Sequence, residues 1–248
     1  MVTSVDIEQY CDEWLRIRKN SPKNFTPKTQ SEWRKSLNAR RSIALKSIAS
    51  AVKHWEWKDH LRLNVWFSEA LSHSDRKWFV VDLFNIGILP NPLFKDMLMA
   101  GVLERNPSAN RAFIEVCIKH RGLKSVLELL IQYIKYGSNI EKAGAIQASY
   151  WATHNYLNED IDDLKLQFKS LVLDEFIQNE DVSVRTNIVP FLELEAYPEF
   201  MHEKFFKAAK IARAHESEYI RHRIALQLKD ESALKENGLL MAMAKPLN

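Results

Sequence analysis

A recurrent order of polar and apolar residues runs through most of the chain. A polar or acidic turn is followed by a basic residue and then by apolar residues at the spacing of an amphipathic helix. The five segments that begin in this way are HSDRKWFVVDLF from His73, SANRAFIEVCI from Ser108, SNIEKAGAIQA from Ser138, EDVSVRTNIVPFL from Glu180 and ESEYIRHRIALQL from Glu216. Their basic residues recur every 31 to 43 residues and are Arg76, Arg111, Lys142, Arg185 and Arg221. Intervals of this length predict stacked two-helix repeats.

Apolar stripes predict the individual helices. The residues expected to be buried at three- and four-residue spacing are Ile7, Tyr10, Cys11, Trp14 and Leu15, then Leu123, Val126, Leu127, Leu130, Ile131 and Ile134, then Leu164, Phe168, Leu171 and Val172, then Val184, Ile188, Phe191 and Leu192, and finally Ile220, Ile224, Ala225 and Leu228. Two prolines predict a loop after residue 20, followed by another helix through Trp33 and Ile48. Pro190 is expected to kink its helix.

Composition supports an all-α fold. The chain of 248 residues contains only six glycines, whereas tight hairpins need residues that tolerate positive φ. The phosphate-binding motifs GxGxxG and GxxxxGK[ST] are absent. We therefore predict a right-handed α-α superhelix, with a basic, Trp-rich helical cap over 1–58, about five helix pairs over 59–230 and a closing helix over 231–248.

The sequence also suggests a cellular setting. The two cysteines, Cys11 and Cys117, are far apart in helical patterns and indicate a reduced protein. The N-terminus has no basic segment followed by an apolar core, and the longest apolar run, from Val126, is too short to span a bilayer. We expect a cytoplasmic protein without a membrane partner. The eight histidines form no metal-binding spacing, and no metal or other cofactor is expected.

Positive charge is concentrated near the N-terminus. Residues 1–60 hold 12 Lys and Arg against 7 Asp and Glu, whereas the remainder is slightly acidic. Clustered cations attract polyanions, so these side chains are candidate phosphate-binding groups. The alternative interpretation is a solvated helix surface. The candidates are Arg34, Lys35, Arg40, Arg41, Lys46 and Lys53.

The second-helix openings resemble those of the HEAT-repeat family and, more broadly, of armadillo-like helical solenoids. DVSVR, from Asp181 to Arg185, is close to the acid, valine and arginine that recur in that family, and the resemblance extends from about His60 to Asp230. It implies that the second helices line a concave face that binds a ligand, most often a protein.

Trp78 and Asp82 are four residues apart and share a helix face, and Arg111 begins the next second helix. This arrangement resembles, more weakly, the active site of the HEAT-like alkylpurine DNA glycosylases. The resemblance implies that these three side chains hold an extruded base. The further tryptophan of that family is replaced here by Ile146, and a core tryptophan beside a surface aspartate is the alternative interpretation.

The sequence therefore favours a non-enzymatic scaffold or adaptor that binds a partner protein along its concave face. The predicted contact residues are the five basic residues of the openings, although each of them is also suited to pairing with an acid of the adjacent repeat. The alternative is a DNA-binding protein with base-excision or damage-recognition activity through Trp78, Asp82 and Arg111.

Overall fold

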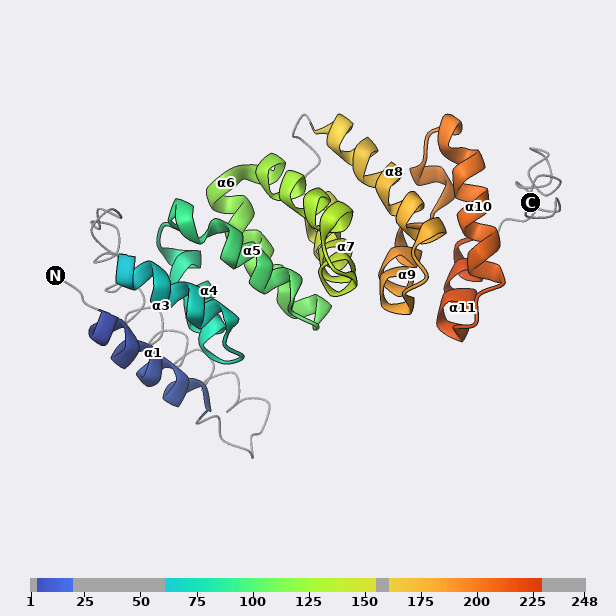
Figure 1. The fold of residues 1–248 in the computed structure, drawn as a ribbon. Coiled ribbons are helices and arrows are strands. Elements are labelled where there is room, and N and C mark those ends of the chain that lie inside the picture. The colour runs from blue at the N-terminus through green and yellow to red at the C-terminus, as the bar shows by residue number, and fades with distance from the viewer. Residues whose placement is uncertain (1–3, 20–60, 155–160, 229–248) are drawn as a thin grey trace, which may run out of the picture. The chain divides into compact units, whose positions relative to one another are not determined.

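The computed structural model describes residues 4–19, 61–154 and 161–228, and these ranges contain helices and no strands. The α-helices are α1 (Ser4–Lys19), α3 (Leu61–Ser72), α4 (Arg76–Ile86), α5 (Phe94–Val102), α6 (Pro107–Tyr136), α7 (Asn139–His154), α8 (Asp162–Gln178), α9 (Val182–Ile188), α10 (His202–Arg213) and α11 (Glu218–Gln227) (Figure 1). Short 3-10 turns are η2 (Asn91–Leu93), η3 (Val189–Phe191), η4 (Leu194–Ala196) and η5 (Glu199–Met201). The all-α prediction is confirmed over this part of the chain.

The chain folds as two compact units. The first comprises residues 1–101 and 108–122, and the second comprises 102–107 and 123–248. The boundary within α6 is at Gly122, whose φ of 78° and ψ of 156° are not helical. A side chain disfavours this positive φ, so glycine allows one helix to end and the next to begin without an intervening loop.

An aromatic cluster forms the core of the first unit. α1 packs on α3 and α4, and α3 packs on α4. The ring of Trp14 lies edge-on to Phe79 at 6.0 Å, and Phe67 lies 5.2 Å from Phe84. Edge-to-face pairs of this kind stabilise a core by roughly 0.5–1.5 kcal/mol beyond the burial of their surface. The aromatic residues of α1, α3 and α4 therefore join these helices through one cluster.

Three consecutive basic residues at the end of the first half of α6 satisfy backbone carbonyls. Lys119 donates to the carbonyl oxygen of Asn85 at 2.5 Å, and His120 Nε2 lies 2.9 Å from that of Phe84. Arg121 donates to the carbonyl oxygen of Leu89 at 3.0 Å. The last carbonyls of a helix have no partner within the helix, so these side chains complete the C-terminus of α4 and the turn that follows.

The second unit arranges its helices in two rows. α7 packs on α9 and α9 on α11, while α8 packs on α10. α8 also contacts α9, and α10 contacts α11, so each first helix packs against its own second helix (Figure 1). The order of helices along the chain thus alternates between the two rows.

Most of the predicted core positions are buried, whereas Leu15, Leu164, Leu171 and Phe191 are half-buried. The stripe from Leu123 to Ile134 is at most 5% exposed at every predicted position. Tyr10 and Ala225 were expected to be buried and are exposed, because α1 and α11 each bury only a narrow face. Pro190 does not kink a longer helix: α9 ends at Ile188 and continues as the 3-10 turn η3.

Some predictions fall outside the described residues. These are the second helix of the N-terminal region, the closing helix and the whole candidate phosphate cluster of Arg34, Lys35, Arg40, Arg41, Lys46 and Lys53. In the ranges that the structure describes, none of the helices combines the length and the apolar character needed to cross a membrane.

Candidate functional site

The second helices of the second unit begin in the same register. The backbone N–H of Lys142 donates to the carbonyl oxygen of Ser138 at 2.8 Å. Arg185 makes the same contact with Asp181 at 3.0 Å, and Arg221 makes it with Ser217 at 3.2 Å. The basic residue is therefore four positions after the capping residue at the start of α7, α9 and α11. The repeated opening seen in the sequence is a repeated first helical turn at these three helices.

The basic side chains at these three openings contact their own chain. Lys142 forms an ion pair of 2.5 Å with Glu175 on α8. Arg185 Nε donates to the carbonyl oxygen of Phe176 at 3.1 Å, near the end of α8. Arg221 donates to the carbonyl oxygens of His215 and Glu216, both at 2.6 Å. These cations hold together the segments around each second helix.

The two basic openings of the first unit also make ion pairs. Arg76 lies 3.2 Å from Glu8 on α1, and Arg111 lies 2.6 Å from Glu115 one turn along α6. The Arg76 pair therefore ties α1 to α4, whereas the Arg111 pair stays within one helix. Exposed pairs of this kind contribute little to stability, at about 1 kcal/mol or less.

Apolar side chains are exposed beside these openings. Ile140 on α7 is 73% exposed, Val182 on α9 is 53% exposed and Tyr219 on α11 is 51% exposed. Each occupies the first or second position of its helix. We call these three residues the apolar row. Ile140 and Tyr219 are two positions after the capping residue and Val182 is one position after it. Single exposed apolar residues are common, but their recurrence in the first turns of packed helices marks a candidate contact surface.

A cleft lies between α7 and α9. Its volume is about 440 Å³, and its walls come from the segment before α6, from α7 between Ile140 and Gln147, and from Ser183 and Asn187 of α9. Gln147 donates to the carbonyl oxygen of Arg105 at 3.4 Å, and Asn187 donates to that of Ser183 at 2.9 Å. Ile140 of the apolar row also lines the cleft. The cleft is therefore mostly polar with an apolar edge, and sequence patterns gave no signal for it.

Trp78, Asp82 and Arg111 occupy neighbouring elements of the first unit. Trp78 and Asp82 are on α4 and Arg111 is on α6. The centroid of the Trp78 ring is 5.1 Å from that of Phe113, and the Arg18 guanidinium lies 5.0 Å from the Trp78 centroid. Trp78 therefore already stacks with groups of its own unit, and a base stacking on the face beside Arg18 would have to displace that cation.

Arg18 joins α1 to α4 through two rings. Its guanidinium lies 5.2 Å from the Trp14 centroid as well as 5.0 Å from that of Trp78. Lys77 places its ammonium 5.5 Å from the Trp78 ring. Cations at these distances are attracted by the negative face of an aromatic ring. Trp78 thus has a structural role in positioning α1.

Neither cysteine is suited to nucleophilic chemistry. Burial raises the pKa of the Cys11 thiol to about 12, and burial raises the pKa of Cys117 further still. The nucleophilic thiolate is thus scarce at neutral pH. Among the described residues, His, Cys, Asp and Glu form no group that is arranged to hold a metal ion.

His215 is expected to make the second unit less stable in mild acid. Burial and then the positive charge of Arg185 lower its pKa below the ordinary 6.5. Its Nδ1 accepts the backbone N–H of Ser217 at 3.0 Å, which requires the unprotonated nitrogen. The unfolded chain therefore binds a proton at His215 more readily than the folded chain does. The contribution of His215 to the free energy of unfolding is fully present above pH 6.5 and is lost as the pH falls toward the lowered pKa.

Urea unfolding between pH 5 and 8 measures this effect. The His215→Gln variant should lose less stability than the wild type as the pH falls from 7.5 to 5.5. An identical pH dependence in the two proteins would contradict the role of His215.

Comparisons of the chain with protein-family models, curated proteins and solved structures gave no match.

Proposed function

We propose that the protein is a non-enzymatic HEAT-like scaffold that binds a partner protein along its second helices. Among the described residues, five helix pairs follow one another: α3 with α4, α5 with the first half of α6, the second half of α6 with α7, α8 with α9, and α10 with α11. In the second unit, first and second helices form separate rows, which supports a solenoid of right-handed α-α superhelical form. Two buried, unpaired cysteine thiols are consistent with a cytoplasmic setting.

The observation that carries the proposal is the apolar row beside the α7–α9 cleft. Exposed large apolar side chains become favourable contacts when a partner covers them, by about 25 cal/mol for each Å² removed from water. The adjoining amide groups of Gln147 and Asn187 provide polar contacts at the edge of such a surface. We place the partner contacts at Ile140, Val182 and Tyr219, because the basic side chains nearby are engaged with their own chain.

Site-specific photo-crosslinking in the native cell tests this proposal. A photoreactive residue replacing Val182 should trap one defined partner, whereas the same residue replacing Lys207 should not. Lys207 is an exposed residue of α10, which is in the row of first helices. Equal trapping at both positions, or trapping at Lys207 alone, would contradict the placement of the surface.

The trapped partner then allows a quantitative test. The double variant Ile140→Asp and Val182→Asp should weaken its binding by at least about tenfold, because charges replace the apolar contacts. Its thermal unfolding should stay near that of the wild type, since both side chains are exposed. Unchanged affinity in a folded double variant would refute the proposed surface.

DNA binding is a second candidate function, favoured by the cations around Trp78. Arg18 and Lys77 lie close to this aromatic ring and are suited to phosphate contact, whereas base stacking on the face beside Arg18 would require that this cation be displaced. Anisotropy titrations across a salt series should then show affinity that falls steeply with salt, and Asp82→Asn should abolish any base release. No binding at low salt would eliminate this candidate.

A further inference from the structure

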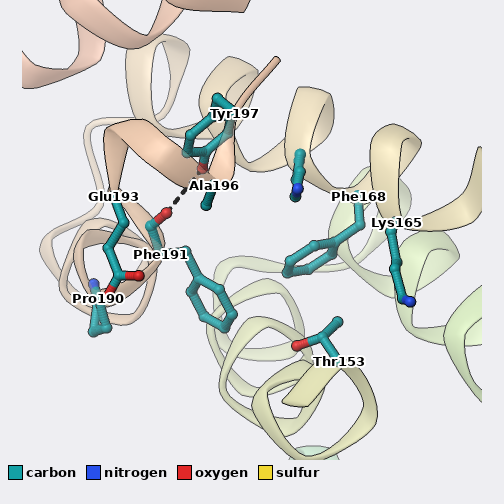
Figure 2. A pocket seen from close by; sticks show the side chains of 9 residues that line it. Thr153, Lys165, Phe168, Pro190, Phe191, Glu193, Ala196 and Tyr197 are labelled. Carbon is teal, nitrogen blue, oxygen red and sulfur yellow. Dashed lines mark hydrogen bonds between the residues drawn. The ribbon is translucent and has the colours of Figure 1, made fainter. Parts of the chain in front are cut away.

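The second unit contains another cavity, of about 270 Å³, near the end of α7 and beside the turns that follow α9. It is bounded by Thr153 near the end of α7, by the first half of α8 and by the turns after α9. Figure 2 shows the rings of Phe168 and Phe191 facing the hollow, with Thr153 on its remaining side. The cavity therefore has walls from three separate stretches of chain.

Aromatic side chains make the cavity suitable for a flat apolar group. The ring centroids of Phe168 and Phe191 are 5.4 Å apart and the ring planes are 74° to one another, so the two rings pack edge to face and together form one wall. The Tyr197 hydroxyl donates a hydrogen bond to the carbonyl oxygen of Phe191 at 3.0 Å. Because this hydroxyl is satisfied, the Tyr197 ring can serve as a second apolar wall of the cavity. A cavity of 150 Å³ lined by apolar side chains holds benzene, so about 270 Å³ is sufficient for two fused rings.

Positive charge is found on one side of this cavity. Lys165 and Lys169 are four residues apart on α8, so both lie on the face that lines it. Lys165 is 3.6 Å from the exposed Asp162, a separation at which a solvated pair is weak. Lys169 makes no ion pair within the ranges that the structure describes, and Glu193 is the one carboxylate among the cavity's described walls. The lining thus carries two cations and one anion.

We propose that this cavity binds a small aromatic carboxylate. The rings of the ligand lie against Phe168 and Phe191, and its carboxylate pairs with Lys169 and Lys165. The Glu193 carboxylate would repel a second negative charge on the ligand, so a monoanionic ligand fits better than a dianionic one. This inference is independent of the partner surface, because the cleft and the cavity have no lining residue in common.

Isothermal titration of the full chain with naphthoate tests the proposal. Naphthylmethylamine and naphthalenemethanol serve as the cationic and neutral analogues of the same size. Naphthoate should bind with a Kd of about 1 mM or tighter, and the amine should bind at least about tenfold more weakly. Absence of naphthoate binding at several times that concentration, or equal binding of the amine, would overturn the proposal.

Charge variants locate the binding site. Lys169→Gln should weaken naphthoate binding about tenfold, whereas Glu193→Gln should strengthen it severalfold by removing a like charge. Lys207→Gln is the matched control, an exposed lysine of α10 outside the lining, and should leave the affinity unchanged. Thermal unfolding establishes that each variant is folded. Equal losses in Lys169→Gln and Lys207→Gln would show general charge attraction and refute a defined site.

Discussion

Replacing Gly144 by alanine should destabilise the second unit by about 3 kcal/mol or more. Gly144 is buried on α7, where the helix passes against the backbone of Val102. A Cβ atom at this position would overlap the carbonyl oxygen of Val102 and lie 2.8 Å from its carbonyl carbon. Backbone atoms cannot move aside as the end of a flexible side chain can, so the helix would have to shift. Urea unfolding of wild type and variant gives the difference in free energy.

A loss or a gain of stability in Gly144→Ala distinguishes a close backbone contact from free space. Alanine within a helix is favoured over glycine by about 0.8–1.0 kcal/mol, so a position with free space would gain stability. A stabilised Gly144→Ala protein would therefore mean that α7 does not approach Val102 closely. The control is Gln147→Ala, one turn later on the same helix and only partly buried. It should change stability by no more than about 0.5 kcal/mol.

Hydrophobic periodicity predicted the all-α character, several of the helices and part of the core. The stripe from Leu123 to Ile134 is buried as expected, since a broad apolar face leaves few ways for a helix to pack. Periodicity also predicted a helix start near Asp181, whose side chain accepts the backbone N–H of Val184 at 3.0 Å. Local patterns specify such features because they depend on residues a few positions apart.

The roles of the basic residues could not be predicted from the same patterns. The sequence shows that a cation recurs at each opening, but the acceptor of Lys142 is 33 residues away on α8. The run from Lys119 to Arg121 has the composition of a charged surface, yet it completes the C-terminus of α4 and the following turn. Long-range pairing depends on how helices pack, and a single sequence does not contain that information.

The cleft and the cavity were equally inaccessible to sequence analysis. Phe168 was predicted as an ordinary core residue, and its ring does lie in a buried position. That it also lines a hollow with Lys169 follows from the turns after α9, which bring Phe191 and Tyr197 opposite α8. Cavities arise where elements fail to fill space, so they have no signature in the spacing of apolar residues.

Replacing Lys142 by methionine should destabilise the second unit by about 2 kcal/mol. The Lys142 and Glu175 side chains are only 16% and 13% exposed, so the variant leaves a partly buried carboxylate without its cation. Removing one partner of a fully buried pair costs about 3–5 kcal/mol. The loss here is smaller because Asn179 Nδ2 still donates to Glu175 Oε2 at 3.1 Å. Urea unfolding monitored by circular dichroism measures the change.

Glu175 is part of a network that joins three helices. Asn179 donates to the Asn139 side chain at 2.9 Å, and Asn139 donates to Asp181 at 3.3 Å. The cap of α9, the start of α7 and the end of α8 are thereby connected through polar side chains. Loss of Lys142 should accordingly loosen the start of α9 and raise hydrogen exchange at its first amides.

A second ion pair of the same unit is the matched control. Lys204 lies 2.9 Å from Asp174, directly before Glu175 in the chain, and the two side chains are 35% and 40% exposed. Because water screens this pair, Lys204→Met should cost less than about 1 kcal/mol. The double variant Lys142→Met and Glu175→Met should recover part of the single-variant loss, since no charge then remains unpaired. Equal losses in Lys142→Met and Lys204→Met would show that burial does not strengthen the Lys142 pair.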